Sequence, residues 1–145
     1  MRRGYTITEF CIVAAVLMAI SIVILPELGR ASMDSRKSQT LSIIQNIQNQ
    51  IDLYKHDHNG VLPSQNQSTF EQALCGKTDR FGAVFTTKLV NMGLKNCGPY
   101  ITHIPANPFN GDNSVRIDGE LAGNNTNGWR FDSTTGFFES DFPIK

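Results

Sequence analysis

The sequence predicts an α+β fold in which a long N-terminal α-helix packs on a small C-terminal antiparallel β-sheet domain. Three observations predict it. Residues 5–58 carry helical apolar patterns and end at a turn signal. The residues that follow are rich in Asn, Gly, Ser and Thr and contain short alternating segments. The chain of 145 residues is long enough for one domain with an appended segment.

The first element is an apolar stretch. Within Phe10–Leu25 the only polar residue is Ser21. Counted from Tyr5, the stretch spans roughly 30 Å as a helix, which is about the thickness of the hydrocarbon core of a bilayer. Arg2 and Arg3 precede it, and positive charge stays on the cytoplasmic side. The sequence therefore predicts a single-pass membrane segment with the C-terminal part outside the cytoplasm.

Three processing routes are open for this stretch: a signal peptide cut after the small-x-small sequence Gly29–Ala31, an uncleaved anchor, or a leader cut earlier, after Gly4. Glu9 favours the third, because an acid costs on the order of 3 kcal/mol at the bilayer centre, and less near its edge, with no benefit to a signal or anchor. A cut after Gly4 exposes the amine of Tyr5, which is positively charged at neutral pH. Glu9 could pair with this amine, its own or a neighbour's, and set the register of packed helices. The alternative is a stray glutamate at the interface.

The helix is expected to continue beyond the apolar stretch. Pro26 lacks an N–H and predicts a kink or a local break. Further on, large apolar residues recur at spacings of three and four and form one stripe. The stripe consists of Ile44, Ile47, Ile51 and Tyr54. His58–Gly60 ends the helix with an Asn-Gly turn signal. The second half of the helix should therefore pack its stripe on a small domain.

The C-terminal part is expected to hold a short helix and several strands. Ser68–Glu71 has the pattern of a capping box that opens the short helix. The expected strand segments are Phe81–Val90, Pro99–Ile104, Ser114–Leu121, Trp129–Asp132 and Gly136–Glu139. The aromatic residues Trp129, Phe131, Phe137 and Phe138 are expected in the core of the sheet. Asn107-Pro108 is expected to form a turn.

The N-terminal sequence resembles a known family. Gly4 followed by YTITEF is similar to the prepilin leader pattern of type IV pilins and type II secretion pseudopilins. In that pattern a glycine precedes the cut and a glutamate is the fifth mature residue, which is Glu9 when Tyr5 is counted as the first. Pro26 falls where these proteins often carry a kinking proline. The chain departs from the pattern at Tyr5, where Phe or Met is usual, and at Thr8, where an apolar residue is usual.

LYKHDHNGVLP (53–63) resembles the end of the long helix in the pseudopilin family. PYITHIPANPFNG (99–111) and GWRFDSTTGFF (128–138) resemble segments of the major, G-type pseudopilins of type II secretion and their relatives. The resemblance implies cleavage between Gly4 and Tyr5 by prepilin peptidase and N-methylation of Tyr5. It implies a single-pass protein of a bacterial inner membrane with a periplasmic domain. It also implies a helical homopolymer that works mechanically in protein export with other pseudopilins and an inner-membrane assembly platform. A type IV or DNA-uptake pilus subunit, and an exported or membrane-anchored binding domain, are the alternatives.

We therefore expect four parts in the chain: a leader (1–4), a membrane and assembly half-helix (5–28), an amphipathic half-helix (29–59) and a globular domain (60–145). No enzyme is expected, because the sequence has no P-loop, dinucleotide fingerprint or HExxH motif. His56-Asp57-His58 does not form a metal motif, since residues two apart on a helix do not share a face, and solvated residues are expected there. A formal net charge of zero gives no footprint for nucleic acid.

A disulfide or a bound metal ion could stabilise the globular domain. If the domain is exported, Cys75 and Cys97 could form a disulfide worth roughly 3 kcal/mol, the alternative being two unrelated thiols. The resemblance also suggests a calcium ion in a C-terminal loop, with Asp112, Asp118 and Asp132 as candidate ligands. Their spacing matches no calcium loop, so ordinary turn carboxylates and no bound cofactor are expected.

Overall fold

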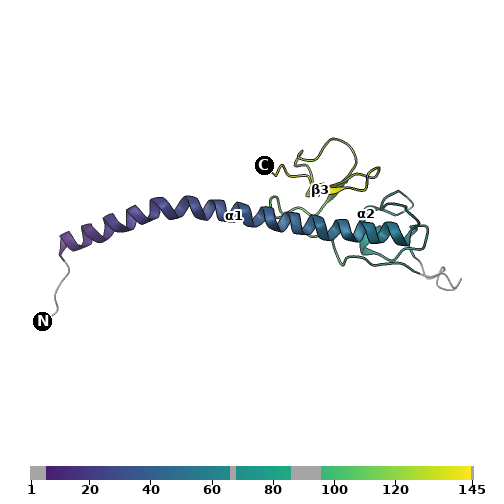
Figure 1. Ribbon diagram of the computed structural model, residues 1–145, viewed down its shortest axis with the longest axis horizontal. Helices are drawn as coiled ribbons and strands as arrows, with labels where there is room; N and C mark the ends of the chain where they lie inside the picture. Colours follow the sequence, from purple (N-terminus) through teal and green to yellow (C-terminus); the bar gives the residue numbers. More distant parts are fainter. Residues whose placement is uncertain (1–5, 66–67, 86–95, 145) are drawn as a thin grey trace. The chain divides into compact units, whose positions relative to one another are not determined.

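The computed structural model describes residues 6–65, 68–85 and 96–144, apart from the side chains of 23–26 and 28. The elements are helix α1 (Ile7–Asp57), helix α2 (Phe70–Cys75) and strands β1 (Val115–Ile117), β2 (Trp129–Phe131) and β3 (Phe138–Ser140) (Figure 1). The expected α+β class with a long helix and a small sheet is confirmed. The chain divides into two compact units, residues 1–36 and residues 37–145, and α1 contributes to both.

In the first unit α1 is a helix with large apolar side chains exposed on its surface. Of the two outcomes expected at Pro26, a kink or a local break, the break does not occur: α1 is continuous at this residue. A bend at Pro26 stays a prediction. Among the residues whose structure is described, no helix is long and apolar enough to cross a membrane.

In the second unit the predicted apolar stripe of α1 forms one side of the core. Ile47, Ile51 and Tyr54 are almost completely buried, and Ile44 packs against them. The remaining core residues come from α2, the sheet and the connecting loops. They are Leu62, Phe70, Ala73, Leu74, Ile104, Trp129, Phe131 and Phe138. The stripe is thus confirmed as the surface on which the domain is built.

The predicted end of the first helix is also confirmed. α1 ends at Asp57, and the next residues form a tight turn in which Asn59 has φ 56° and Gly60 has φ 89°. The N–H of Gly60 donates to the carbonyl of Lys55 at 2.8 Å. This six-to-one bond is a Schellman closure, which satisfies a carbonyl that the last helical turn leaves without a partner.

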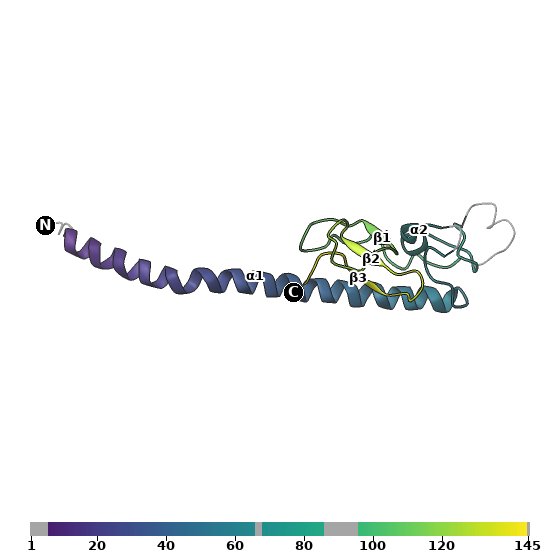
Figure 2. The same ribbon diagram turned by 90° about the horizontal axis from the view of Figure 1, so that it is seen from above.

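The sheet has the order β1-β2-β3 and is mixed, so the prediction of an antiparallel sheet was wrong (Figure 2). β1 pairs with β2 in parallel, and β2 pairs with β3 antiparallel. The connection of residues 118–128 does not form a hairpin. It carries the chain back to the end of the sheet where β1 begins, so β2 runs in the same direction as β1. The strands are shorter than predicted: β1 and β2 lie wholly within the segments Ser114–Leu121 and Trp129–Asp132, whereas β3 starts later than the segment Gly136–Glu139 and ends one residue beyond it.

Helix α1 is tied to the sheet by one amide side chain. The Nε2 of Gln48 donates to the carbonyl of Gly136 at 3.0 Å, and its Oε1 accepts from the N–H of Phe138 at 3.1 Å. The side chain therefore satisfies main-chain groups at the start of β3 in the way that a neighbouring strand would. Gln48 lies beside the apolar stripe, so the same helical face supplies both the packing and the anchor.

Other local expectations need correction. The N-cap of α2 is Thr69, with Gln72 completing the capping box, one residue later than predicted, because the hydroxyl of Ser68 donates instead to the carbonyl of Gly82. Pro99–Ile104 is a loop, as are residues 81–85 apart from a single bridge at Val84; residues 86–90 of that predicted strand lie outside the described part. Phe137 is 64% exposed and is not in the core.

His58 was expected in solvent and is fully buried. Its ring stacks on Tyr54 with centroids 3.8 Å apart. Nδ1 lies 2.8 Å from the carbonyl of Tyr54, and Nε2 lies 2.9 Å from the hydroxyl of Thr78. Because a carbonyl only accepts, Nδ1 carries the proton in this contact. His58 thereby joins the end of α1 to the loop that follows α2.

Candidate functional site

The first candidate site is the start of α1. Thr6 is the N-cap: its hydroxyl lies 3.3 Å from the N–H of Glu9. The carboxylate of Glu9 accepts from the N–H of Thr6 at 2.7 Å and from its hydroxyl at 2.9 Å. The two residues form a reciprocal capping box. The sequence signal Thr-x-x-Glu was present at positions 6–9 and was missed, because Glu9 had been considered only as a charge.

The surface that follows this cap is apolar on every side. Its large side chains are between 48% and 84% exposed in the single chain. They are Ile7, Phe10, Ile12, Val13, Val16, Leu17, Met18, Ile20 and Ile22. The proposed processing residues Gly4 and Tyr5 lie outside the described residues, as does the side chain of Pro26. The helix is thus capped at its start, and the one acidic side chain of the cap lies at the end of an exposed apolar surface.

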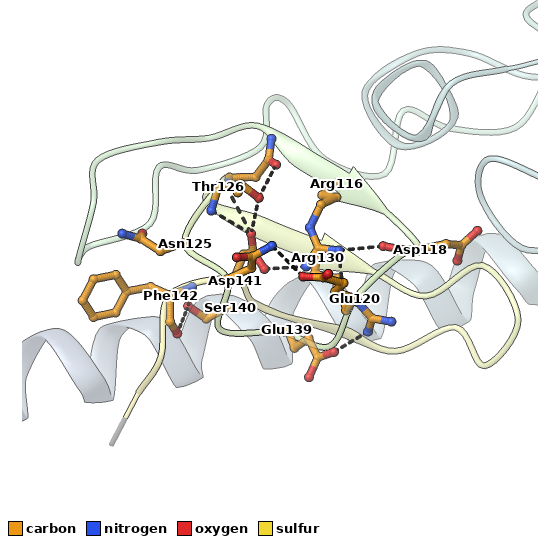
Figure 3. Close-up of polar contacts among 12 residues, drawn as sticks. Arg116, Asp118, Glu120, Asn125, Thr126, Arg130, Glu139, Ser140, Asp141 and Phe142 are labelled. Carbon is orange, nitrogen blue, oxygen red and sulfur yellow. Dashed lines mark hydrogen bonds and ion pairs between the residues drawn. The ribbon is translucent and has the colours of Figure 1, made fainter.

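The second candidate site is a polar cluster on the face of the sheet that carries the arginines (Figure 3). Arg116 of β1 and Arg130 of β2 are register partners. The guanidinium of Arg116 donates to the carbonyls of Asp118 and Glu120, at 2.8 and 2.9 Å, and to a carboxylate oxygen of Asp141 at 2.7 Å. Arg116 thus holds the start of the loop between β1 and β2 and links it to Asp141.

Asp141 is the counter-ion at the centre of this cluster and is completely buried. Besides Arg116, its carboxylate accepts from the N–H and hydroxyl of Thr126 and from the N–H of Asn127, at 3.1–3.2 Å. Burial acts to raise the pKa of Asp141, but the hydrogen bonds from Arg116, Asn127 and Thr126 outweigh it, so the pKa lies below its ordinary value. A buried carboxylate with this many donors stays ionised.

The neighbouring ion pair of Arg130 is more open. Its guanidinium contacts the carboxylate of Glu139, which is 42% exposed, and lies 3.5 Å from that of Asp132. The two arginines therefore differ in environment although they are neighbours in register. Arg116 pairs with an acid that water does not reach, whereas Arg130 pairs with acids that water does reach.

The loops around the cluster are held by Asn107 and Gly128. The amide of Asn107 is buried and donates to the carbonyl of Gly128 at 2.7 Å and to the hydroxyl of Ser140 at 2.8 Å. A side chain at Gly128 would place its Cβ only 1.9 Å from the carbonyl oxygen of Asp112, so this close approach requires glycine. Asn107 does form the expected turn, but sequence reasoning missed its role as a buried anchor.

The three calcium candidates do not converge. Asp112 accepts from the N–H and hydroxyl of Ser114, and Asp118 accepts from the N–H and hydroxyl of Ser133. Asp132 caps the turn that contains Thr134. Asp112 and Asp132 each close a local turn, as expected, whereas Asp118 joins the residues after β1 to the residues after β2. Within the described part of the chain, no group of three or more His, Cys, Asp or Glu side chains is placed to hold a metal ion.

Each cysteine of the globular domain lies in or next to a segment that makes main-chain hydrogen bonds to another part of the chain. Cys97 forms an antiparallel bridge with Thr78, whereas the carbonyl of Leu74, next to Cys75, accepts from the N–H groups of Tyr100 and Ile101. The structure holds both cysteines as thiols. The Cys75–Cys97 disulfide therefore stays a prediction.

Comparison of the chain with models of protein families, with curated proteins and with solved structures finds no match.

The buried ion pair predicts a large effect for Asp141→Asn. The substitution keeps the volume but leaves the guanidinium of Arg116 without a counter-ion, which should lower the free energy of unfolding by about 3 kcal/mol. Glu139→Gln is the matched control: it makes the same chemical change opposite Arg130, where the acid is half exposed, and should cost less than about 1 kcal/mol. Urea unfolding of the full chain in detergent measures both. Equal losses in the two variants would contradict the assignment of Asp141 as the centre of the cluster.

Acid should weaken the domain through the same carboxylate. The pKa of Asp141 is lower in the folded chain than in the unfolded chain, so its contribution is complete above the unfolded value of about 3.9 and is lost as the pH falls toward the folded value. Hydrogen bonds also lower the pKa values of Asp112 and Asp132. We expect a constant free energy of unfolding between about pH 7 and 5 from these groups and a fall below about pH 4. The free energy of unfolding should fall less steeply with decreasing pH in Asp141→Asn. An unchanged pH dependence in that variant would show that Asp141 does not contribute to the loss of stability in acid.

Proposed function

We propose that the chain is a structural subunit of a pilin-like filament that polymerises through the first part of α1 and acts mechanically in protein export, as in a type II secretion pseudopilus. The observation that carries the proposal is the uncovered apolar surface of α1 between Ile7 and Ile22. The proposed role is mechanical and includes no chemical step beyond the processing of the chain itself.

An apolar helix surface of this kind needs a covering. Burial of apolar area contributes about 25 cal/mol per Å², so nine large side chains left in water represent a strong force for association. A helix that is apolar all round is found in a protein core or in lipid. In the proposal, lipid covers the helix first and copies of the same helix cover it in the filament. The membrane step rests on the sequence run Phe10–Leu25, part of which lies beyond the described side chains.

Glu9 supplies the second argument. Its carboxylate is held at the helix start by two hydrogen bonds from Thr6, so its charge is fixed in position relative to the apolar surface. These bonds use only Oε2, and Oε1 receives none among the described residues. In the proposal, prepilin peptidase cuts between Gly4 and Tyr5, and the amine of Tyr5, methylated, pairs with the carboxylate of Glu9. Pairing removes two unpaired ions from an apolar environment at once.

The partners and the location follow from the same reading. We place the subunit in a bacterial inner membrane with the globular domain on the periplasmic side, since Arg2 and Arg3 precede the apolar run. Other copies of the chain, further pseudopilins and an assembly platform in the inner membrane are the proposed partners. The similarity of residues 99–111 and 128–138 to major pseudopilins supports secretion over an adhesive or DNA-uptake pilus.

Substitutions at Glu9 can separate its two roles. Glu9→Gln removes the charge but keeps an oxygen that can accept from Thr6, so the cap survives. Thr6→Ala removes the N-cap hydroxyl but keeps the charge of Glu9. We expect Glu9→Gln to leave the monomer folded and membrane-bound and to reduce filament formation at least about tenfold, as Glu9→Ala should, because one unpaired ion then remains in an apolar setting.

Filaments sheared from cells, counted by electron microscopy and quantified by immunoblot, provide the measurement. Thr6→Ala should assemble at close to the level of the parent chain. Normal filaments from Glu9→Gln would contradict the proposal that the charge of Glu9 sets the register of the packed helices. A defect in Thr6→Ala as large as that in Glu9→Gln would show that assembly depends on the cap of the helix and not on the charge of Glu9 alone.

A further inference from the structure

The outer edge of the small sheet has main-chain groups that the domain itself does not use. In the parallel pairing of β1 with β2, the carbonyl of Ser114 accepts from the N–H of Trp129 at 3.0 Å, and the N–H of Asp118 donates to the carbonyl of Phe131 at 2.8 Å. Main-chain groups alternate in direction along a strand. The N–H and C=O groups of Val115 and Ile117 therefore point away from β2. They have no hydrogen-bond partner among the described residues.

A cavity of about 460 Å³ lies beside this edge. One wall is β1 with the residues before it, and the other is the first turn of α2. Its apolar lining includes Phe70, Ile104, Val115 and Ile117. Phe70 packs against Phe131 with ring centroids 4.7 Å apart, so α2 is fixed against the sheet and the cavity is a built feature of the domain.

The cavity carries one charge. Glu71 lines it, and the carboxylate forms no ion pair with any residue that the structure describes. An occupant with a basic side chain would meet this acid, and an apolar side chain would meet the lining from Phe70 and Ile104. Alternate side chains of an extended segment point to the same side, so one apolar and one basic residue two positions apart fit both requirements.

We propose that the cavity between α2 and β1 binds an extended peptide segment of a partner protein, which adds to β1 as a fourth strand. The main-chain groups of Val115 and Ile117 supply the hydrogen bonds, the apolar lining takes one side chain, and Glu71 pairs with a basic residue two positions along. This is the β-augmentation mode of recognition. The inference concerns the globular domain alone and does not rest on the filament role.

The test uses the full chain in detergent micelles and the peptide acetyl-Thr-Val-Thr-Lys-Thr-amide, whose Val and Lys share one face. Hydrogen exchange is followed by NMR at the amides of Val115 and Ile117. Saturating peptide should slow both amides at least fivefold, and the same peptide with all its main-chain amides methylated should not. Replacement of the peptide Lys by Glu should weaken binding several-fold, as should Glu71→Gln in the protein.

Two variants at one position isolate the main chain from the side chain. Ile117→Pro removes an N–H that the sheet does not use and should abolish protection at Val115, whereas Ile117→Thr keeps that N–H and should retain it. Unchanged exchange at saturating peptide would overturn the proposal, as would equal protection by the methylated peptide. Protection that needs no peptide and rises with protein concentration would assign the edge to a second copy and overturn the proposed partner.

Discussion

The proposed function depends on one constraint: the first part of α1 carries large apolar side chains that are exposed on the helix surface. Ile7 to Ile22 carry side chains that other proteins bury, and they stand exposed along the helix. A fold can leave such a surface uncovered only if a partner or a lipid phase covers it. The cap formed by Thr6 and Glu9 closes the end of this surface and fixes the position of its one acid. The proposed filament is the arrangement that answers this constraint.

The globular unit meets a different problem, because it has little regular structure to stabilise it. Its sheet has three strands of three residues each. Long loops are held instead by buried polar side chains, each of which satisfies several main-chain groups. Arg116 and Asp141 hold the loop between β1 and β2, and Asn107 holds the loop before β1. Buried polar groups that are hydrogen-bonded in this way favour one arrangement of the loops, so the domain is specified by a few polar residues as much as by its core.

Features with a local signal could be predicted from the sequence. The stripe of α1 and its closure at Asn59 and Gly60 depend on periodicity and on one turn, and both are confirmed. The predicted start of α2 was wrong by one residue. Both Ser68–Glu71 and Thr69–Gln72 fit the capping-box pattern, and the choice between them depends on the distant contact of Ser68 with Gly82.

Pairings between distant segments have no local signal. The parallel pairing of β1 with β2 follows from the path of residues 118–128, which Arg116 and Asp141 fix across twenty-five positions of sequence. The burial of His58 likewise depends on Tyr54 and Thr78 together. In the candidate sites, the charge of Glu9 could be recognised from the sequence but its cap was missed. Of the acids considered for calcium, Asp112 and Asp132 form local turns, whereas Asp118 bonds to Ser133, a distant contact that has no local signal.

The most direct test of the account is the intact mass and N-terminal sequence of the mature protein isolated from membranes. We expect a chain that begins at Tyr5 and is heavier by one methyl group, because the apolar helix must be retained for assembly and its amine must be free to meet Glu9. A chain that begins at Ser32 would contradict it: the apolar run would then be a discarded signal, and the function would reside in the globular unit alone.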